Sequence, residues 1–568
     1  MPSSQIASRR FRSLRGRWPW LVVLLPALLY LAFLPHFGAL QNNDYFGSIL
    51  TYLGTEGGFA AHAERYVQAR SNEHRIALPM LVYDLNYRLS RGSNRPLSAL
   101  AVALMGIVFV LLYRLLPLAA RQPPVHQAAF GLLVAAFVFT PVAAHNVAMG
   151  FSGIMWFMSN VMFISALVVL VRRGPEGGLA ALWPIAFFGA LGLFSYSTSL
   201  SMWPALVVAA LCLRLGWRKI TLLTAFAILA YGYYFATYAT MRGQPGPNTD
   251  DPGAALAFFG IYLGGIFTRD TALATWIGWG GALLALALVV FVLVRRRALL
   301  PRLAPWLAIQ AFGVSNAAGT AIGRSNFGDQ MAVSSRYATL PGFFWAGLLL
   351  SAAVLSLERA LAARRRRVAL CAVFAVFLAL AVPMYVRGVA LLEAFANRAL
   401  FQRLAELALV RGYYDSYAMH AVTPVVEEFW RARGPLIRLG HHPFDRPHPP
   451  PADSAIAPRA AKPHPALRGA MTGVSRTEDG TLRPVGWSLA ERAHGDGPGI
   501  EAMAVVDAAG RPVGELILGL PTPAEARRAG VQDPHTGWAG YARGVAPEGL
   551  RIYARLSGDP RWYPLPGE

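Results

Sequence analysis

Charged side chains are scarce in this 568-residue chain. Asp, Glu, Lys and Arg together supply 14% of the residues, whereas hydrophobic types supply 55% and the mean hydropathy is +0.40. Soluble domains carry about 25% charged residues. The shortage therefore excludes a soluble enzyme and predicts a protein that crosses the membrane many times.

Lysine is nearly missing, since only Lys219 and Lys462 occur, and the formal charge of +22 comes almost entirely from arginine. Such an excess could indicate a nucleic-acid partner. The arginines, however, stand in short clusters at the ends of apolar runs, as topology signals do, and no soluble module gathers them on one face. We therefore predict no binding to nucleic acid.

Cysteine is also rare. Cys212 and Cys371 lie in or beside apolar runs, which argues against a disulfide framework. The glycine-rich stretches 260–265 and 278–281 lack the strand, loop and lysine of a nucleotide site, so they are predicted as helix-packing surfaces. No His, Cys or carboxylate stands at a metal-binding spacing from His74. No cofactor is predicted, and the question of a metal ion is left open.

Long apolar runs dominate what the chain does contain. A stretch of 254–268 would invert everything after it if it crossed the bilayer, so it is predicted as a re-entrant or interfacial helix. The first run follows a basic segment, residues 1–17, and lacks a small-residue cleavage site, which predicts a retained anchor helix. Eleven runs could cross a bilayer core of about 30 Å: residues 18–37, 97–119, 127–145, 152–171, 178–197, 202–217, 220–240, 272–294, 303–322, 338–357 and 368–386.

Arginine placement predicts the orientation of these spans. Every second loop, on the side of the N-terminus, carries arginine, and the clusters 295–297 and 364–367 are examples. The short loops on the opposite side hold only Arg242, Arg269, Arg324 and Arg336. We therefore expect a multi-pass protein of the bacterial inner membrane with a cytoplasmic N-terminus. An odd number of spans leaves the C-terminal part in the periplasm.

The character of the chain changes after residue 386. Residues 387–440 are predicted as extracytoplasmic amphipathic helices, because leucine and phenylalanine recur there at helical spacing. Residues 441–466 form a proline-rich linker. Short β-type runs follow, separated by Gly, Pro and Asp. The predicted fold is an all-α polytopic membrane domain, residues 18–386, followed by a periplasmic β-sandwich, residues 467–568.

The first outer loop, residues 38–95, gathers ionisable side chains in a chain that has few. Asp44 comes shortly after the first span and suits a general base; the alternatives are a helix cap or a solvated carboxylate. Glu73, His74 and Arg75 follow a predicted amphipathic helix. They could bind a sugar and a phosphate, or they could be ordinary surface charges.

A second polar stretch, residues 323–341, supplies Arg324, Arg336 and Tyr337 among Gly and Ser. Its backbone can approach a ligand while the arginines hold an anion such as a lipid-linked phosphate. The alternative is that the arginines reach toward lipid head groups. Asn146 lies at the same predicted membrane boundary. Asp44 is thus the predicted catalytic residue, and the predicted substrate-binding residues are Glu73, His74, Arg75, Asn146, Arg324, Arg336 and Tyr337.

This layout resembles the bacterial GT-C-type polytopic glycosyltransferases. The resemblance lies in the anchor helix, in QNNDYFGSIL and SNEHRIALP of the first outer loop, and in GRSNFG followed by SSRY, and it covers residues 18–386. It implies a GT-C-like fold, a polyprenyl-phosphate-linked sugar as donor, and an acceptor-contacting acid in the first outer loop, here Asp44. Many relatives have two acidic residues there, whereas this chain has Asn42, Asn43 and Asp44.

We therefore expect transfer of a sugar from a polyprenyl-phosphate carrier to a glycan or lipid acceptor on the periplasmic face, within cell-envelope polysaccharide biosynthesis. The partners would be that donor, the acceptor and membrane lipids. A transporter or flippase of lipid-linked sugars is an alternative, although it would need more charged groups within the spans. An O-antigen polymerase or ligase, or a non-catalytic assembly protein that works through its β-domain, are further alternatives.

Overall fold

The computed structural model describes residues 19–53, 59–116, 124–238, 246–248, 250–358, 362–447, 460, 462–490 and 499–566. The basic segment 1–17 and most of the proline-rich linker lie outside these residues. The chain divides into two compact units. Unit 1 comprises Met1–Pro35, Thr55–Leu85 and Arg95–Glu393; unit 2 comprises His36–Gly54, Asn86–Asn94 and Ala394–Glu568.

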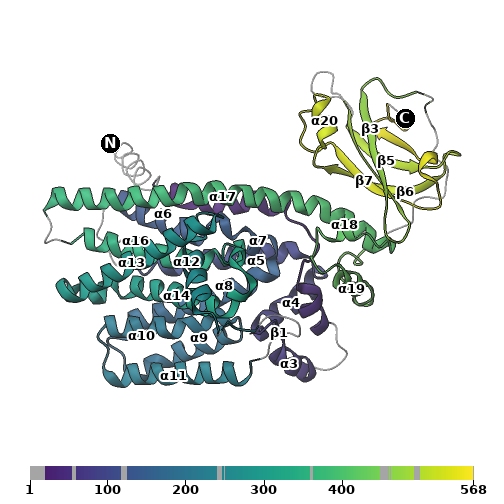
Figure 1. Ribbon diagram of the computed structural model, residues 1–568. Coiled ribbons are helices and arrows are strands. Elements are labelled where there is room, and N and C mark those ends of the chain that lie inside the picture. The colour runs from purple at the N-terminus through teal and green to yellow at the C-terminus, as the bar shows by residue number, and fades with distance from the viewer. Residues whose placement is uncertain are drawn as a thin grey trace, which may run out of the picture. The chain divides into compact units, whose positions relative to one another are not determined.

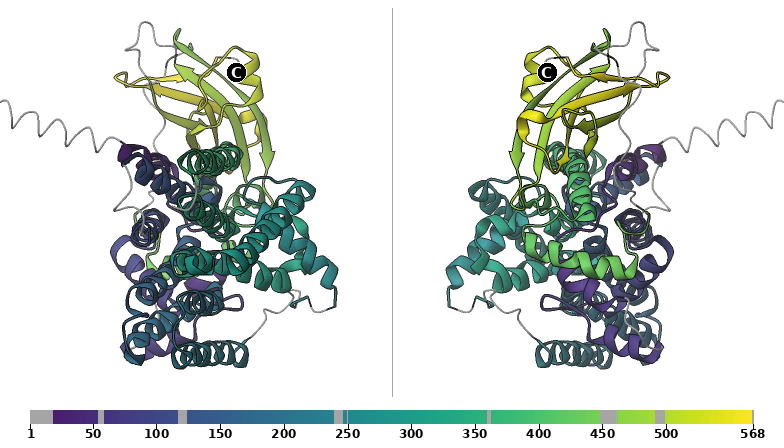
Figure 2. Two further views of the ribbon diagram at one scale, coloured as in Figure 1. Left: turned by 90° about the vertical axis from the view of Figure 1, so that its left-hand side faces the viewer. Right: turned by 90° about the vertical axis from the view of Figure 1, so that its right-hand side faces the viewer.

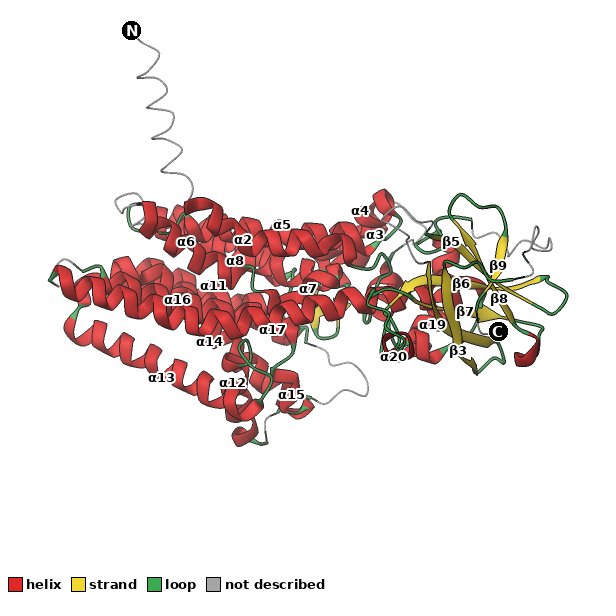
Figure 3. Ribbon diagram, turned by 90° about the horizontal axis from the view of Figure 1, so that it is seen from above, coloured by secondary structure: helices red, strands yellow, loops and turns green. Residues whose placement is uncertain are grey.

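Unit 1 is built from apolar helices, and Figures 1 and 3 show its long helices running side by side. Each of the eleven predicted spans coincides with a helix. These helices are α2 (Pro19–Phe33), α5 (Asn94–Tyr113), α6 (Pro124–Val138), α8 (Gly150–Arg173), α9 (Trp183–Leu193), α10 (Met202–Cys212), α11 (Trp217–Ala236), α13 (Thr271–Arg295), α14 (Leu300–Arg324), α16 (Thr339–Ser356) and the first part of α17 (Ala363–Arg411).

Seven of the described helices are long and apolar enough to cross a membrane: α5, α6 continued through α7 (Ala144–Ala148), α8, α11, α13, α16 and α17. Their outward faces are apolar as well, since Trp276 of α13 is 79% exposed and Val386 of α17 is 69% exposed. Side chains of this kind are stable outside a protein core when they meet lipid. The prediction of a polytopic helical membrane domain is confirmed.

The awkward stretch 254–268 is a short helix, α12 (Pro252–Gly264), packed against α13. Its 13 residues span about 20 Å, which is less than a bilayer core. The two helices approach closely through glycine: a Cβ on Gly264 would lie 2.0 Å from the carbonyl oxygen of Ala274, and one on Gly278 would lie 1.9 Å from that of Gly260. These glycines therefore form a helix-packing surface, as predicted.

Unit 2 ends in a β-domain, as predicted, but its strands form one curved sheet where a two-sheet sandwich was predicted (Figure 2). All seven strands are antiparallel to their neighbours, in the order β3-β4-β7-β6-β5-β8-β9. Leu467, Val505, Trp538 and Ile552 meet in the core that the sheet covers. The strands are β3 (Leu467–Arg476), β4 (Leu482–Ala490), β5 (Ile500–Val506), β6 (Pro512–Leu520), β7 (Gly537–Ala542), β8 (Arg551–Leu556) and β9 (Trp562–Pro564).

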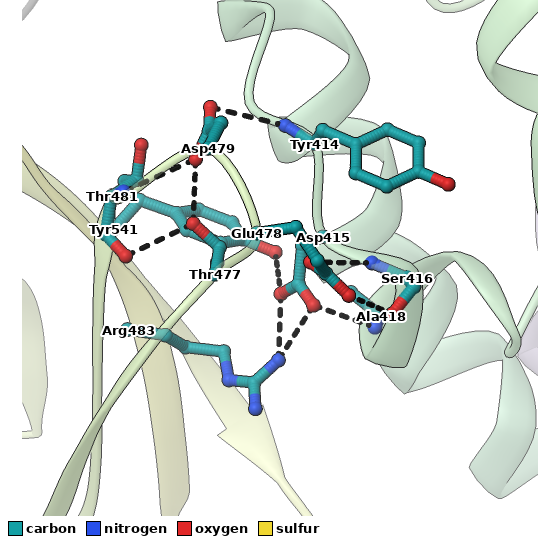
Figure 4. Close-up of polar contacts among 10 residues, drawn as sticks. All are labelled: Tyr414, Asp415, Ser416, Ala418, Thr477, Glu478, Asp479, Thr481, Arg483 and Tyr541. Atoms are coloured by element: carbon teal, nitrogen blue, oxygen red, sulfur yellow. Dashed lines mark hydrogen bonds and ion pairs between the residues drawn. The ribbon is translucent and has the colours of Figure 1, made fainter.

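Within unit 2 the sheet is joined to the helical segment α18 (Ser416–Met419) through a buried carboxylate, Asp415 (Figure 4). Nη1 of Arg483, on β4, donates to both Asp415 oxygens at 2.6 and 2.8 Å, and the hydroxyl of Tyr541, on β7, donates at 2.7 Å. The backbone amide of Ala418 donates to the same carboxylate at 3.2 Å. One charged group therefore holds two strands and a helix start together.

Candidate functional site

Unit 1 contains a polar cluster that begins at a β-hairpin after α3 (Phe59–Gln68). The strands β1 (Arg70–Ser71) and β2 (His74–Arg75) pair with Ser71 opposite His74. Asn72 occupies the two-residue turn with φ of 53°, a left-handed conformation that asparagine tolerates. The turn places Glu73 at the hairpin tip and His74 on the strand beside it.

His74 is buried and held on both ring nitrogens. Its Nδ1 lies 2.5 Å from Oγ of Ser197, and its Nε2 lies 3.3 Å from Oε1 of Glu73. The ring of Tyr196 lies against it, with centroids 3.9 Å apart. Burial, with a smaller contribution from nearby arginines, lowers the pKa of His74 to about 4 despite the opposing charge of Glu73. The imidazole is therefore neutral at physiological pH.

Glu73 forms an ion pair with Arg324 at the end of α14. Each side chain is only 16% exposed. Burial works to raise the pKa of Glu73, but His74 and Arg324 outweigh it and hold the pKa below its ordinary value. Glu73 is therefore an ionised carboxylate, and its partner guanidinium remains within reach of solvent.

Arg336 enters the same cluster from the short helix η10 (Ser335–Tyr337). Its guanidinium lies 5.2 Å from the ring centre of Tyr337 and donates to Sδ of Met331 at 2.9 Å. Its backbone carbonyl accepts a 2.7 Å hydrogen bond from the amide of Asn146, which in turn accepts one from Ser152. Asn146, one of the predicted binding residues, is fully buried, and its hydrogen bond positions the backbone of Arg336.

Aromatic rings line this cluster. Trp156 of α8 lies 5.0 Å from Tyr196 and 5.8 Å from Tyr337, and Tyr262 of α12 lies 5.4 Å from Tyr337, measured between ring centroids. Neither Trp156 nor Tyr262 could be recognised in the sequence, because both lie inside apolar runs. Tyr196 belongs to the polar turn before η7 (Ser197–Ser201), a stretch that its serines mark.

Arg75, also predicted to bind substrate, points elsewhere. Successive side chains of a strand face opposite sides, so Arg75 turns away from the side of His74. Its Nη1 donates to the carbonyl of Val67 at 3.4 Å, and its guanidinium lies 6.0 Å from the ring of Tyr233. The structure thus groups five predicted residues: Glu73, His74, Arg324, Arg336 and Tyr337. Asn146 is bonded to the backbone of Arg336.

Ser197, His74 and Glu73 have the composition of a hydrolytic triad, but not its electrostatics. Glu73 is committed to Arg324, and a histidine whose pKa is about 4 is a weak base at neutral pH. The arrangement therefore suits a neutral hydrogen-bond network. Two arginines and one carboxylate leave a net charge of +1 on the named ionisable groups of the cluster, which favours an anionic ligand.

Asp44 belongs to unit 2, not to the unit that holds Glu73. The first outer loop, predicted as one segment, is divided because residues 36–54 bond to distant parts of unit 2. Asp44 precedes the short helix η2 (Tyr45–Ile49), but its side chain makes no capping hydrogen bond there. It is exposed. Burial and the charge of Asp44 raise the pKa of Glu428, on α19 (Val426–Leu439), so the two carboxylates are neighbours.

The backbone beside Asp44 is fixed by contacts to α17 and to the chain after α19. Gln402 donates to the side chain of Asn42. Tyr45 shares a 2.9 Å hydrogen bond with Nε2 of His441. Gly92, with φ of 74°, packs so closely on that ring that a Cβ would lie 1.9 Å from Nε2. Asp44 is thus an exposed carboxylate on an anchored segment.

A pH-dependent contact lies next to this anchor. Nδ1 of His442 is 3.1 Å from Asp445, and its Nε2 is 3.7 Å from Glu406 of α17. Burial opposes protonation, but Glu406 and Asp445 outweigh it and raise the pKa of His442. The stabilisation that His442 gains from Asp445 and Glu406 should be fully present below its ordinary pKa of about 6.5. It should be lost as the pH rises through the raised pKa of the folded protein.

His442→Gln should therefore lower the melting temperature of the full-length protein more at pH 6 than at pH 8.5. We expect a difference of roughly 1 kcal/mol between the two conditions, the size of a partly exposed ion pair. His535→Gln, at an exposed site of the β-domain, is the matched control and should show no such pH dependence. An equal loss at both pH values for His442→Gln would contradict a charged contact.

No three His, Cys, Asp or Glu side chains in the described part of the chain are grouped as metal ligands. The sequence matches no protein-family profile and no curated protein. Among solved structures it is similar to ArnT from Cupriavidus metallidurans bound to undecaprenyl phosphate, at 15% identity over 74% of this chain and 76% of that chain, with a TM-score of 0.36. A likeness at this level assigns no role to any residue of this chain.

Proposed function

We propose that this protein is a membrane glycosyltransferase that takes a sugar from a polyprenyl-phosphate carrier and passes it to a glycan or lipid acceptor on the periplasmic face. The observation that supports it is the cationic cluster of Arg324 and Arg336 among Trp156, Tyr196 and Tyr337. Arg324 ends the apolar helix α14, and Arg336 lies just before the apolar helix α16. Arginine binds phosphate, and aromatic faces suit a sugar ring.

The proposed reaction is a displacement at the anomeric carbon of the sugar. The acceptor hydroxyl oxygen forms a bond to that carbon while the bond from the carbon to the phosphate oxygen breaks. The phosphate leaves with the electron pair, and the acceptor proton passes to a general base, the role that the sequence predicts for Asp44. Arg336 and Arg324 stabilise the negative charge that grows on the departing phosphate. Glu73 pairs with Arg324 in the unliganded site, and His74 contacts Glu73 and Ser197.

Binding of a polyprenyl monophosphate to the purified protein in nanodiscs tests the phosphate site. Arg336→Gln should weaken binding about 10- to 100-fold, because a charge-assisted hydrogen bond contributes about 1.5–3 kcal/mol. Arg269→Gln, at an exposed arginine of the same unit, is the control and should bind as the wild type does. Wild-type protein that fails to bind the lipid phosphate, or Arg336→Gln that binds normally, would refute the proposal.

A further inference from the structure

We infer that Glu73 is a built-in competitor for Arg324: its carboxylate occupies the guanidinium that a phosphate group would otherwise use, and it weakens binding of a doubly charged phosphate most. The inference rests on the proposed function. It assigns Glu73 a role distinct from direct contact with the sugar, and it explains why a carboxylate stands in a site for anions.

The contacts of Glu73 show that this competition is strong. The carboxylate bonds directly to Arg324, and the same oxygen, Oε1, lies 3.3 Å from Nε2 of His74. Both side chains of the ion pair are 16% exposed, so solvent screens them less than a surface pair. The hairpin turn fixes the backbone of Glu73. An incoming anion must therefore displace a positioned carboxylate rather than a mobile one.

The charges of the cluster predict for which anion Glu73 weakens binding more. Arg324, Arg336 and Glu73 sum to +1, which balances the single charge of a phosphodiester such as a lipid-linked sugar. The carrier released by transfer is a phosphomonoester with about 1.5 to 2 negative charges at neutral pH. While Glu73 retains Arg324, the additional charge has no counterpart. Glu73 thus limits how tightly the product phosphate is held and favours its release.

The test is a titration with polyprenyl monophosphate in nanodiscs, for the wild type, Glu73→Gln and Glu73→Ala. Both variants should bind about fivefold more tightly, the effect of removing a competing ion pair of about 1 kcal/mol. Higher ionic strength should reduce the gain. Glu64→Gln changes an exposed carboxylate of α3 and should leave binding unchanged. A gain in affinity cannot arise from a damaged fold, so misfolding cannot imitate the expected result.

A parallel titration with inorganic phosphate separates the two sources of the ligand. The same gain with inorganic phosphate supports competition for a free phosphate group, and a gain confined to the lipid supports competition for a head group. If the wild type binds the lipid phosphate but both Glu73 variants bind it equally or more weakly, the inference is wrong while the proposed function stands. Weaker binding would indicate that Glu73 contacts the ligand. If the wild type binds neither probe, the proposed function itself fails.

Discussion

Asp44→Asn is expected to abolish sugar transfer while leaving expression and the binding of polyprenyl monophosphate unchanged. Asparagine keeps the shape of aspartate but cannot accept the acceptor proton, and loss of a general base costs about 10²- to 10⁴-fold in rate. The side chain of Asp44 is exposed and makes no capping hydrogen bond. Its removal should therefore cost little stability, so that a loss of transfer reports on chemistry.

The assay follows release of polyprenyl phosphate from a polyprenyl-phosphate-linked sugar in nanodiscs. Glu427→Gln, at an exposed carboxylate of the same unit, is the matched control and should retain full activity. Full activity of Asp44→Asn would remove the proposed base.

The helical framework was predictable because its cause is local. A run of apolar residues long enough to cross the bilayer must satisfy its backbone internally, and an α-helix does so within one segment. Each of the eleven predicted runs accordingly coincides with a helix. The glycines of α12 and α13 were predictable for a similar reason, because small residues at helical spacing allow two helices to approach.

The cationic cluster was predictable in part. Glu73 and Arg324 are 251 positions apart, and alternating spans were enough to predict that they share one side of the membrane. Their direct pairing was not predictable, because it depends on the left-handed turn at Asn72. The same turn begins the strand that carries Arg75 to the other side. Trp156 was missed since an aromatic residue inside an apolar run looks like any other core residue.

The division of the first outer loop between the two units could not be predicted from the sequence. Residues 36–54 belong to unit 2 because of partners that follow several hundred residues later, among them Gln402 and His441. The spacing of Asp44 and Glu73 in the sequence does not indicate that the two residues belong to different units. The C-terminal β-domain shows the same limit, because alternating apolar residues predict strands but do not decide whether they close into one sheet or two.

Arg483→Met should strongly destabilise unit 2, by about 3–5 kcal/mol, because it leaves the Asp415 carboxylate buried without its counter-ion. The Asp415 side chain is 1% exposed, and among the described residues Arg483 is its ion-pair partner. Thermal unfolding of the full-length protein, with limited proteolysis of the β-domain, measures the loss. Arg528→Met removes an exposed pair with Glu525, 76% and 51% exposed, and should cost about 0.5 kcal/mol or less.

A second replacement separates a missing charge from a missing side chain. If the cost of Arg483→Met comes from the uncompensated carboxylate, adding Asp415→Asn should recover part of it, and the two changes should be clearly non-additive. Tyr541 and the amide of Ala418 would still have an oxygen to donate to. A loss for Arg483→Met no larger than that for Arg528→Met would show that the strands are held to α18 by packing alone, with the buried carboxylate contributing no net stability.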